Sequence, residues 1–221
     1  MSNEEIDALI RAAGRALARH GLVHAYGHCS IRATDNTFRV SAAKPLGLIT
    51  DADACLGVPL EGQLPDGMLG EVRVHREIYR LRPDVNAIVR CTPPRTVSLS
   101  AMMRAPRSRH GFGSYFYPSP PLWSDPRLLR DDEQAMRLAN FLGTARAVVI
   151  RGNGAVVTGE SIQQALALTW YLEDSARVEL DCLAVGLAET GLMTRKEAAA
   201  RAVWNGRIAE RMWDYLTAEP V

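Results

Sequence analysis

The sequence has almost no net charge. Its 26 lysine and arginine residues are matched by 25 aspartate and glutamate residues, which leaves a formal charge of +1 over 221 residues. Binding to nucleic acid or to an anionic membrane surface usually needs a clustered excess of cations. We therefore expect neither nucleic acid nor a membrane among the partners of this protein.

Long hydrophobic runs and closely spaced cysteines are also missing. No apolar stretch approaches the roughly 20 residues that cross a bilayer, and Glu4, Glu5 and Asp7 lie where a signal peptide would be basic and then apolar. The chain has no CxxC pair among its four cysteines, which are Cys29, Cys55, Cys91 and Cys182. This spacing favours reduced thiols and argues against a disulfide framework or a zinc knuckle. We expect a cytoplasmic protein without disulfides.

The residue pattern predicts a single α/β domain over residues 1–221. With 47% hydrophobic residues, the chain is long enough to bury a large core. Capping residues and helical spacing predict helices over 2–20, 71–82, 93–103, 131–142, 161–187 and 194–216. Short β-type runs predict a hairpin over 29–41 and strands over 87–89, 147–150 and 155–157. Because strands and helices alternate without strict βαβ repetition, we expect a mixed or antiparallel central sheet flanked by helices.

Four segments in a fixed order carry a family resemblance. They are Gly-His-Cys-Ser-Ile-Arg at 27–32, Glu71 followed by His75 and Ile-Tyr-Arg-Leu-Arg-Pro-Asp-Val at 78–85, Arg-Cys-Thr-Pro-Pro at 90–94, and Val-Ile-Arg-Gly-Asn-Gly-Ala at 149–155. Together they resemble the class II aldolase/adducin family, which includes sugar-phosphate aldolases, pentulose-phosphate epimerases, a decarboxylase branch and the adducin head domain. The stretch at 78–85 is the most specific piece.

The resemblance implies a three-layer fold and an assembly. It implies an antiparallel sheet of about nine strands and a fourfold-symmetric homo-tetramer with sites at subunit contacts. Residues 104–127 would then form a lid or an interface, in which Tyr115 or Tyr117 could donate a proton; the alternative is a surface arm that pairs with a neighbouring subunit. We expect this segment and the apolar face of the last helix to be under-buried in a single chain, which predicts a homo-oligomer.

The family's chemistry depends on a divalent metal held by three histidines. In this sequence the three positions are Arg90, Thr92 and Asn153. Metal sites of this type need imidazole, thiolate or carboxylate ligands, and an arginine would oppose the ion with its own charge. Strand alternation also directs Cys91 away from the cavity. We expect no metal and no other cofactor.

Two residues are the candidate catalytic groups. Glu71 corresponds to the family's acid/base glutamate, although a carboxylate at a helix N-terminus is also stabilised by the helix dipole alone. Arg90 has two equally supported interpretations. It is either a fixed cation for a carboxylate or enolate, or it fills the vacated cavity and pairs with Glu71, which would lower the pKa of that carboxyl.

Five further residues are candidate substrate contacts. His28 stands where the family has a substrate-contacting asparagine, and a tolerated polar turn residue is the equally weighted alternative. His75, one helical turn after Glu71, is expected to have a packing or surface role. Leu69-Gly70 replaces the family's adjacent serines, which favours an unphosphorylated substrate. The complete set of substrate-binding candidates is Gly27, His28, Ser41, Thr92 and Asn153.

The sequence supports three functional hypotheses. The first is a metal-independent carbon–carbon lyase, of the aldolase or decarboxylase type, that acts on a small anionic carboxylate or carbonyl compound. The second is a non-catalytic binding or scaffold protein similar to the adducin head. The third is a metal-dependent sugar-phosphate aldolase or epimerase with substitute ligands. The retained Glu71 favours an enzyme, whereas the loss of all three histidines favours a scaffold.

Overall fold

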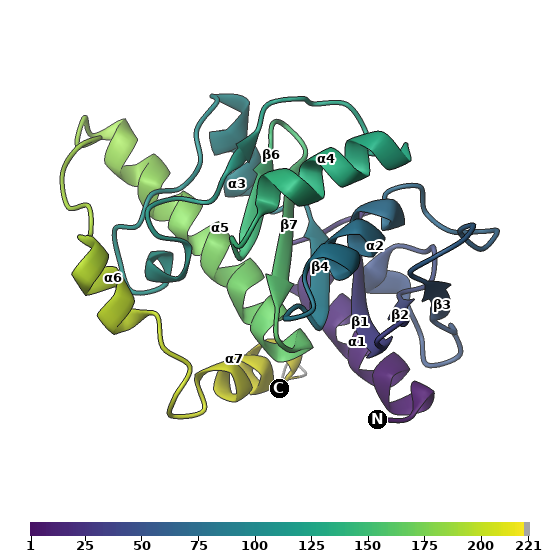
Figure 1. The fold of residues 1–221 in the computed structure, drawn as a ribbon. Coiled ribbons are helices and arrows are strands. Elements are labelled where there is room, and N and C mark those ends of the chain that lie inside the picture. The colour runs from purple at the N-terminus through teal and green to yellow at the C-terminus, as the bar shows by residue number, and fades with distance from the viewer. Residues whose placement is uncertain (219–221) are drawn as a thin grey trace.

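The computed structural model describes residues 1–218, which form one central sheet with helices on both faces (Figure 1). The strands are β1 (His28–Thr34), β2 (Thr37–Val40), β3 (Leu56–Pro59), β4 (Ala87–Cys91), β5 (Leu122–Trp123), β6 (Ala147–Ile150) and β7 (Gly154–Gly159). The helices are α1 (Asn3–Arg19), α2 (Val72–Leu81), α3 (Pro94–Ala101), α4 (Asp132–Leu142), α5 (Ile162–Ala184), α6 (Arg195–Arg201) and α7 (Ile208–Thr217), with two 3-10 turns, η1 (Leu46–Leu48) and η2 (Gly113–Phe116).

The sheet has the strand order β3-β2-β1-β4-β7-β6-β5. Neighbouring strands are antiparallel except for β5 and β6, which are parallel. The expected single α/β unit with a mixed sheet is confirmed, but the sheet has seven strands in the described residues rather than about nine. Pro120 and Pro121 precede β5, and because proline cannot donate to a sheet ladder, this edge strand stays short.

Side-chain alternation along the strands separates two cores. On β4, Val89 and Cys91 lie in the core that α1 and α5 cover, whereas Ile88 lies in the core that α2 and α4 cover. Figure 1 shows the sheet between these two helical layers. Cys91 is fully buried and points away from Arg90, as expected from the alternation. The arginine therefore projects toward the α2 side of the sheet.

The C-terminal region differs from its prediction. The single helix expected over 194–216 is two helices, α6 and α7, separated by residues 202–207, which include a turn at Gly206 and Arg207. Both residues have positive φ angles, 77° and 58°, a conformation that interrupts an α-helix. The capping boxes predicted at Ser2 and at Thr194 are both present.

Residues 104–127 are packed against the rest of the chain. Tyr115 and Phe116 are buried, at 5% and 6% exposure, and the Tyr115 hydroxyl donates to the Val203 carbonyl. Arg107 and Arg109 both form ion pairs with Glu179 of α5. The prediction that this segment is under-buried in one chain is wrong for Tyr115, because α5 and the segment before α7 cover it. A buried, hydrogen-bonded phenol is not a mobile proton donor.

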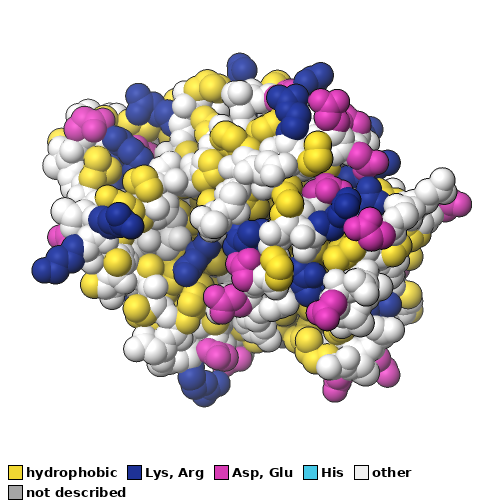
Figure 2. Space-filling model, viewed as in Figure 1, with side chains coloured by type: hydrophobic (Ala, Val, Ile, Leu, Met, Phe, Trp, Pro, Cys, Tyr) yellow, Lys and Arg dark blue, Asp and Glu magenta, His cyan; other side chains and the backbone are white. Residues whose placement is uncertain are grey.

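Charges of both signs are mixed on the molecular surface. On the face drawn in Figure 2, basic and acidic side chains are interspersed with apolar atoms and no extended region carries one sign. Within residues 1–218, no helix is long and apolar enough to cross a membrane.

Candidate active site

One end of the sheet borders a cavity of about 640 Å³, a size typical of small-molecule sites. The carboxyl end of β4, the start of β1 and the turn between β6 and β7 all lie at this end, because these strands are antiparallel neighbours. The N-terminus of α2 and the loop before α4 complete the walls. The polar lining residues are His24, Tyr26, His28, Lys44, Glu71, Arg90, Thr92, Arg130 and Asn153.

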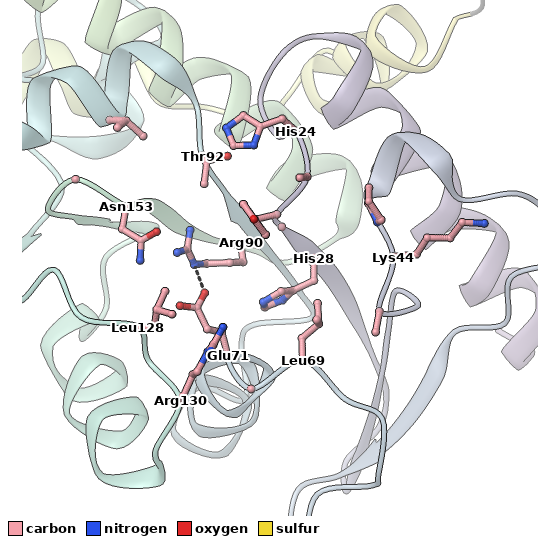
Figure 3. A pocket seen from close by; sticks show the side chains of 18 residues that line it. His24, His28, Lys44, Leu69, Glu71, Arg90, Thr92, Leu128, Arg130 and Asn153 are labelled. Atoms are coloured by element: carbon pink, nitrogen blue, oxygen red, sulfur yellow. Dashed lines mark hydrogen bonds and ion pairs between the residues drawn. The ribbon is translucent and has the colours of Figure 1, made fainter.

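An ion pair between Arg90 and Glu71 lies within this cavity (Figure 3). Arg90 Nε donates to Glu71 Oε2 at 2.9 Å, and Arg90 Nη1 donates to the Cys91 carbonyl at 2.8 Å. The two side chains are 4% and 15% exposed. Of the two interpretations offered for Arg90, the structure contains the pairing with Glu71. Arg90 Nη2 has no hydrogen-bond partner among the described residues.

Glu71 precedes the first turn of α2 and is held from two sides. Its other oxygen, Oε1, accepts a hydrogen bond from the Leu129 backbone at 3.3 Å. Burial by itself would raise the pKa of Glu71, but the Arg90 guanidinium and the Leu129 hydrogen bond outweigh burial and hold the pKa below its usual value. The carboxylate is therefore ionised near neutral pH, and the pair with Arg90 makes it a weaker base than an unpaired glutamate.

His28 lies beside Arg90 on the neighbouring strand, because the two residues are register partners in the antiparallel pair of β1 and β4. The imidazole is 3% exposed, and neither ring nitrogen has a partner in the part of the chain that the structure describes. Burial, followed by the positive charge of Arg90, lowers the pKa of His28 to about 4. A neutral imidazole next to the ion pair can donate one hydrogen bond and accept another.

The buried His75 lies behind His28. A hydrogen-bonded contact with Ser30 fixes the ring of His75. The two imidazole centroids are 4.6 Å apart, and His75 Nδ1 lies 2.7 Å from Ser30 Oγ. Burial also lowers the pKa of His75. The packing role expected for His75 is confirmed, because its side chain is fully buried and does not line the cavity.

Gly27, Thr92 and Asn153 also line the cavity. A Cβ atom on Gly27 would approach Val23 Cγ1 to 2.7 Å and the Arg90 carbonyl to 3.0 Å, and its φ is +144°, so this position needs glycine. Thr92 Oγ1 and Asn153 Nδ2 are buried without a hydrogen-bond partner within residues 1–218. Buried polar atoms without partners are costly, which is consistent with a site shaped for a ligand.

Ser41 is the exception among the predicted substrate contacts. It does not line the cavity; its side chain is buried and its Oγ accepts a hydrogen bond from the Cys29 backbone at 3.3 Å. The Ser41 amide in turn donates to the Cys29 carbonyl at 2.9 Å. The hydroxyl thus extends the pairing of the β1–β2 hairpin, a role that the local sequence could not distinguish from ligand binding.

Arg130 is a cavity residue that sequence reasoning missed. It lies in an irregular loop 40 residues after Arg90 in the sequence, and no motif marks it. Lys44 is a second basic lining residue, but its amine lies 3.0 Å from Asp53. Figure 3 shows the Lys44 side chain extending away from Arg90 and Glu71. The fold therefore brings three cationic side chains, Lys44, Arg90 and Arg130, to one cavity.

The residues of the cavity do not fit a divalent metal. Within residues 1–218, no group of three or more His, Cys, Asp or Glu side chains could hold a metal ion. Three potential donors of these types line the cavity, His24, His28 and Glu71. His28 and Glu71 both lie beside the guanidinium of Arg90. A metal ion beside them would be opposed by that fixed positive charge and would compete with it for Glu71.

Comparisons with known proteins agree on the fold. The model of the Class II Aldolase and Adducin N-terminal domain matches residues 8–180. The crystal structure of L-fuculose-1-phosphate aldolase from Thermus thermophilus superposes with a TM-score of 0.74 at 30% identity, over 85% of this chain and 98% of that one.

Curated relatives include a decarboxylase and an adducin. A 3,4-dihydroxyphthalate decarboxylase from Arthrobacter keyseri is 29% identical over 80% of this chain and 78% of its own length. Human beta-adducin is 25% identical over 80% of this chain, which spans only 27% of that protein. Since the domain model covers most of the sequence and the solved structure, at 30% identity, matches 85% of it, the chain belongs to the class II aldolase and adducin family.

Proposed function

We propose that this protein is a carbon–carbon lyase of the decarboxylase type that acts, without a metal, on a small hydroxylated aromatic carboxylate. The observation that carries the proposal is the ionised Glu71 paired with Arg90 inside a cavity that also holds a neutral imidazole. The relatives named as decarboxylases of 3,4-dihydroxyphthalate support the reaction class. Apolar side chains of Val97, Leu69 and Leu128 line the same cavity and suit an aromatic ring.

Arg90 takes the part of the fixed cation in this proposal. Three of its N–H groups, two on Nη2 and one on Nη1, remain after its bonds to Glu71 and the Cys91 carbonyl. A substrate carboxylate that meets them gains charge-assisted hydrogen bonds. Arg90, Thr92 and Asn153, at the positions where the family resemblance implies metal-binding histidines, would thus provide a cation and polar contacts in place of the metal.

Glu71 carries the proton in the proposed reaction. It accepts the proton of a ring hydroxyl adjacent to the carboxylate-bearing carbon, and the electron-rich ring then takes that proton at this carbon. The bond to the carboxylate breaks, its electron pair returns to the ring, and carbon dioxide leaves. The phenolate that remains takes a proton from water, so that the sum consumes one proton. His28 donates a hydrogen bond to the developing phenolate oxygen.

The first prediction concerns the proton carrier. Glu71→Gln should lower kcat for release of carbon dioxide by about 10²–10⁴-fold, the usual contribution of a positioned acid or base. Binding of the acid should be unchanged or tighter, because the substitution removes a negative charge next to Arg90. The assay uses 3,4-dihydroxyphthalate and a panel of dihydroxybenzoates, and calorimetry measures binding in parallel.

Glu133→Gln, an exposed change on α4 outside the cavity, is the matched control and should keep wild-type rates. Equal rates in wild type and Glu71→Gln would remove Glu71 from the mechanism. The mutual neutralisation of Arg90 and Glu71 favours a second function, that of a non-catalytic scaffold. This function is supported if the wild-type protein neither binds nor converts any acid of the panel.

A further inference from the structure

The charges in the cavity do not balance. Three cationic side chains, Lys44, Arg90 and Arg130, line it. Arg90 is paired with Glu71 at 2.9 Å and Lys44 with Asp53 at 3.0 Å. The Arg130 guanidinium forms no hydrogen bond or ion pair with any residue of the 1–218 range. The unbalanced positive charge of the cavity therefore belongs to Arg130, not to Arg90.

The stem of Arg130 is seated against the segment that carries Glu71. A Cβ atom built on Gly70 would lie 3.1 Å from Arg130 Cγ and 3.5 Å from Arg130 Cδ. A larger residue at position 70 would push this stem away. The neighbouring Leu129 amide donates to Glu71 Oε1 at 3.3 Å. The stem of Arg130 thus passes over Gly70, next to Glu71 in the sequence. The residue is exposed, and Figure 3 shows it among the cavity side chains.

We propose that Arg130 forms a second anion subsite, so that the cavity selects a ligand with two acid groups, one at Arg90 and the other at Arg130. The inference rests on the proposed function for the acid at Arg90, and it adds the class of substrate: a small dicarboxylate. The apolar side chains of Leu69 and Leu128 line the cavity together with both arginines and fit the carbon frame that joins the two acids.

A carboxylate and a phosphate share the chemistry that a guanidinium recognises. A planar carboxylate attached to an aromatic ring suits the apolar walls, whereas a sugar phosphate would bring hydroxyl groups against Leu69 and Leu128. We therefore assign the second acid group as a carboxylate. Glycerol 3-phosphate is included in the experiment to test whether the subsite prefers a phosphate to a carboxylate.

The experiment measures binding without turnover. Calorimetry compares phthalate, benzoate and glycerol 3-phosphate on wild type, Arg130→Gln and Arg127→Gln. Arg127 is exposed in the same loop, as Arg130 is, but it pairs with Asp125 and does not line the cavity, so it is the matched control. We expect wild type to bind phthalate at least about tenfold more tightly than benzoate, and Arg130→Gln to reduce this ratio to about two, because one charge-assisted contact is lost.

Several outcomes overturn the inference. Unchanged phthalate affinity in Arg130→Gln, or an equal loss of phthalate and benzoate affinity, means that Arg130 does not hold a second carboxylate. Tighter binding of glycerol 3-phosphate than of phthalate, lost in Arg130→Gln, reassigns the subsite to phosphate. If phthalate binding depends on Arg130 but the protein turns over none of the acids, the proposed function is wrong while the anion subsite at Arg130 is supported. Thermal melts check that the Arg130 variant is folded.

Discussion

At the scale of residues, Arg90 and Glu71 form a buried ion pair in the cavity. Because Arg90 and Glu71 are both largely removed from water, each neutralises a charge that would otherwise be costly to bury. The same contact keeps Glu71 ionised. If Arg90 also acts as the proposed fixed cation, a substitution there changes both the stability and the proposed chemistry.

Arg90→Met should lower the free energy of unfolding by about 3 kcal/mol, because it leaves Glu71 buried without its partner. Urea denaturation at pH 7 measures the change. The double variant Arg90→Met with Glu71→Leu should recover part of the loss, since it buries no unpaired charge. A loss below about 0.5 kcal/mol in the single variant, the size of an ordinary surface substitution, would contradict the importance of the pair.

His28 makes the stability depend on pH. Its pKa is lowered to about 4 in the folded protein from an ordinary value of 6.5, so the unfolded chain binds a proton at a pH where the folded chain does not. Stability is therefore complete above pH 6.5 and declines as the pH falls toward about 4, by roughly 3 kcal/mol for this group. His28→Asn should show a correspondingly flatter decline in urea denaturation.

The matched control is His24→Asn, because His24 is exposed at the same cavity. It should keep the wild-type slope between pH 6.5 and 4.5. A decline of equal size in wild type and His28→Asn would mean that His28 is solvated in solution. His75, whose pKa is also lowered by burial, continues to contribute in every variant.

At the scale of elements, α5 binds the segment 104–127, for which the sequence left more than one role open. Glu179 of α5 is 1% exposed and accepts hydrogen bonds from both Arg107 and Arg109. Arg107 and Arg109 also bond to the Ala188 carbonyl beyond the end of α5. One buried carboxylate thus connects two segments about 70 residues apart in the sequence.

Glu179→Ala should release residues 104–112 from α5 while the sheet stays protected. We expect faster amide hydrogen exchange in this segment and a loss of about 2–4 kcal/mol in stability, because two arginines lose their buried partner. Glu189→Ala, which removes an exposed partner of Arg107, is the control and should cost less than about 1 kcal/mol. Uniform exchange changes across the whole chain would mean that Glu179 does not act locally.

At the scale of the whole molecule, the antiparallel topology decides what the cavity contains. The start of β1, the end of β4 and the β6–β7 turn meet at one sheet end, although the sequence separates His28 from Asn153 by 125 positions. The homo-tetramer expected from the family resemblance stays a prediction for this chain. Exposed apolar side chains that such an assembly could cover include Tyr26, Leu48 and Val185.

Local patterns were sufficient to predict most elements and the family. The Ser2 and Glu5 capping box, the turn residues between β1 and β2, and the apolar runs of β4 and β6 act over a few neighbours, so the sequence contains their causes. Glu71, Arg90, His28, Thr92 and Asn153 were likewise found from motifs, and the fold places all five around one cavity.

Contacts between distant segments decided the rest. The sequence left two interpretations of Arg90 open, and the approach of α2 to β4 selected the pair with Glu71. Ser41 belongs to the hairpin and does not line the cavity, whereas Arg130 lines the cavity beside Gly70 although no sequence motif marks it. Spacing and composition determine which side chains a chain has and what each can do chemically. Whether a charge meets a partner or stays free for a ligand depends on packing between segments, which no local pattern contains.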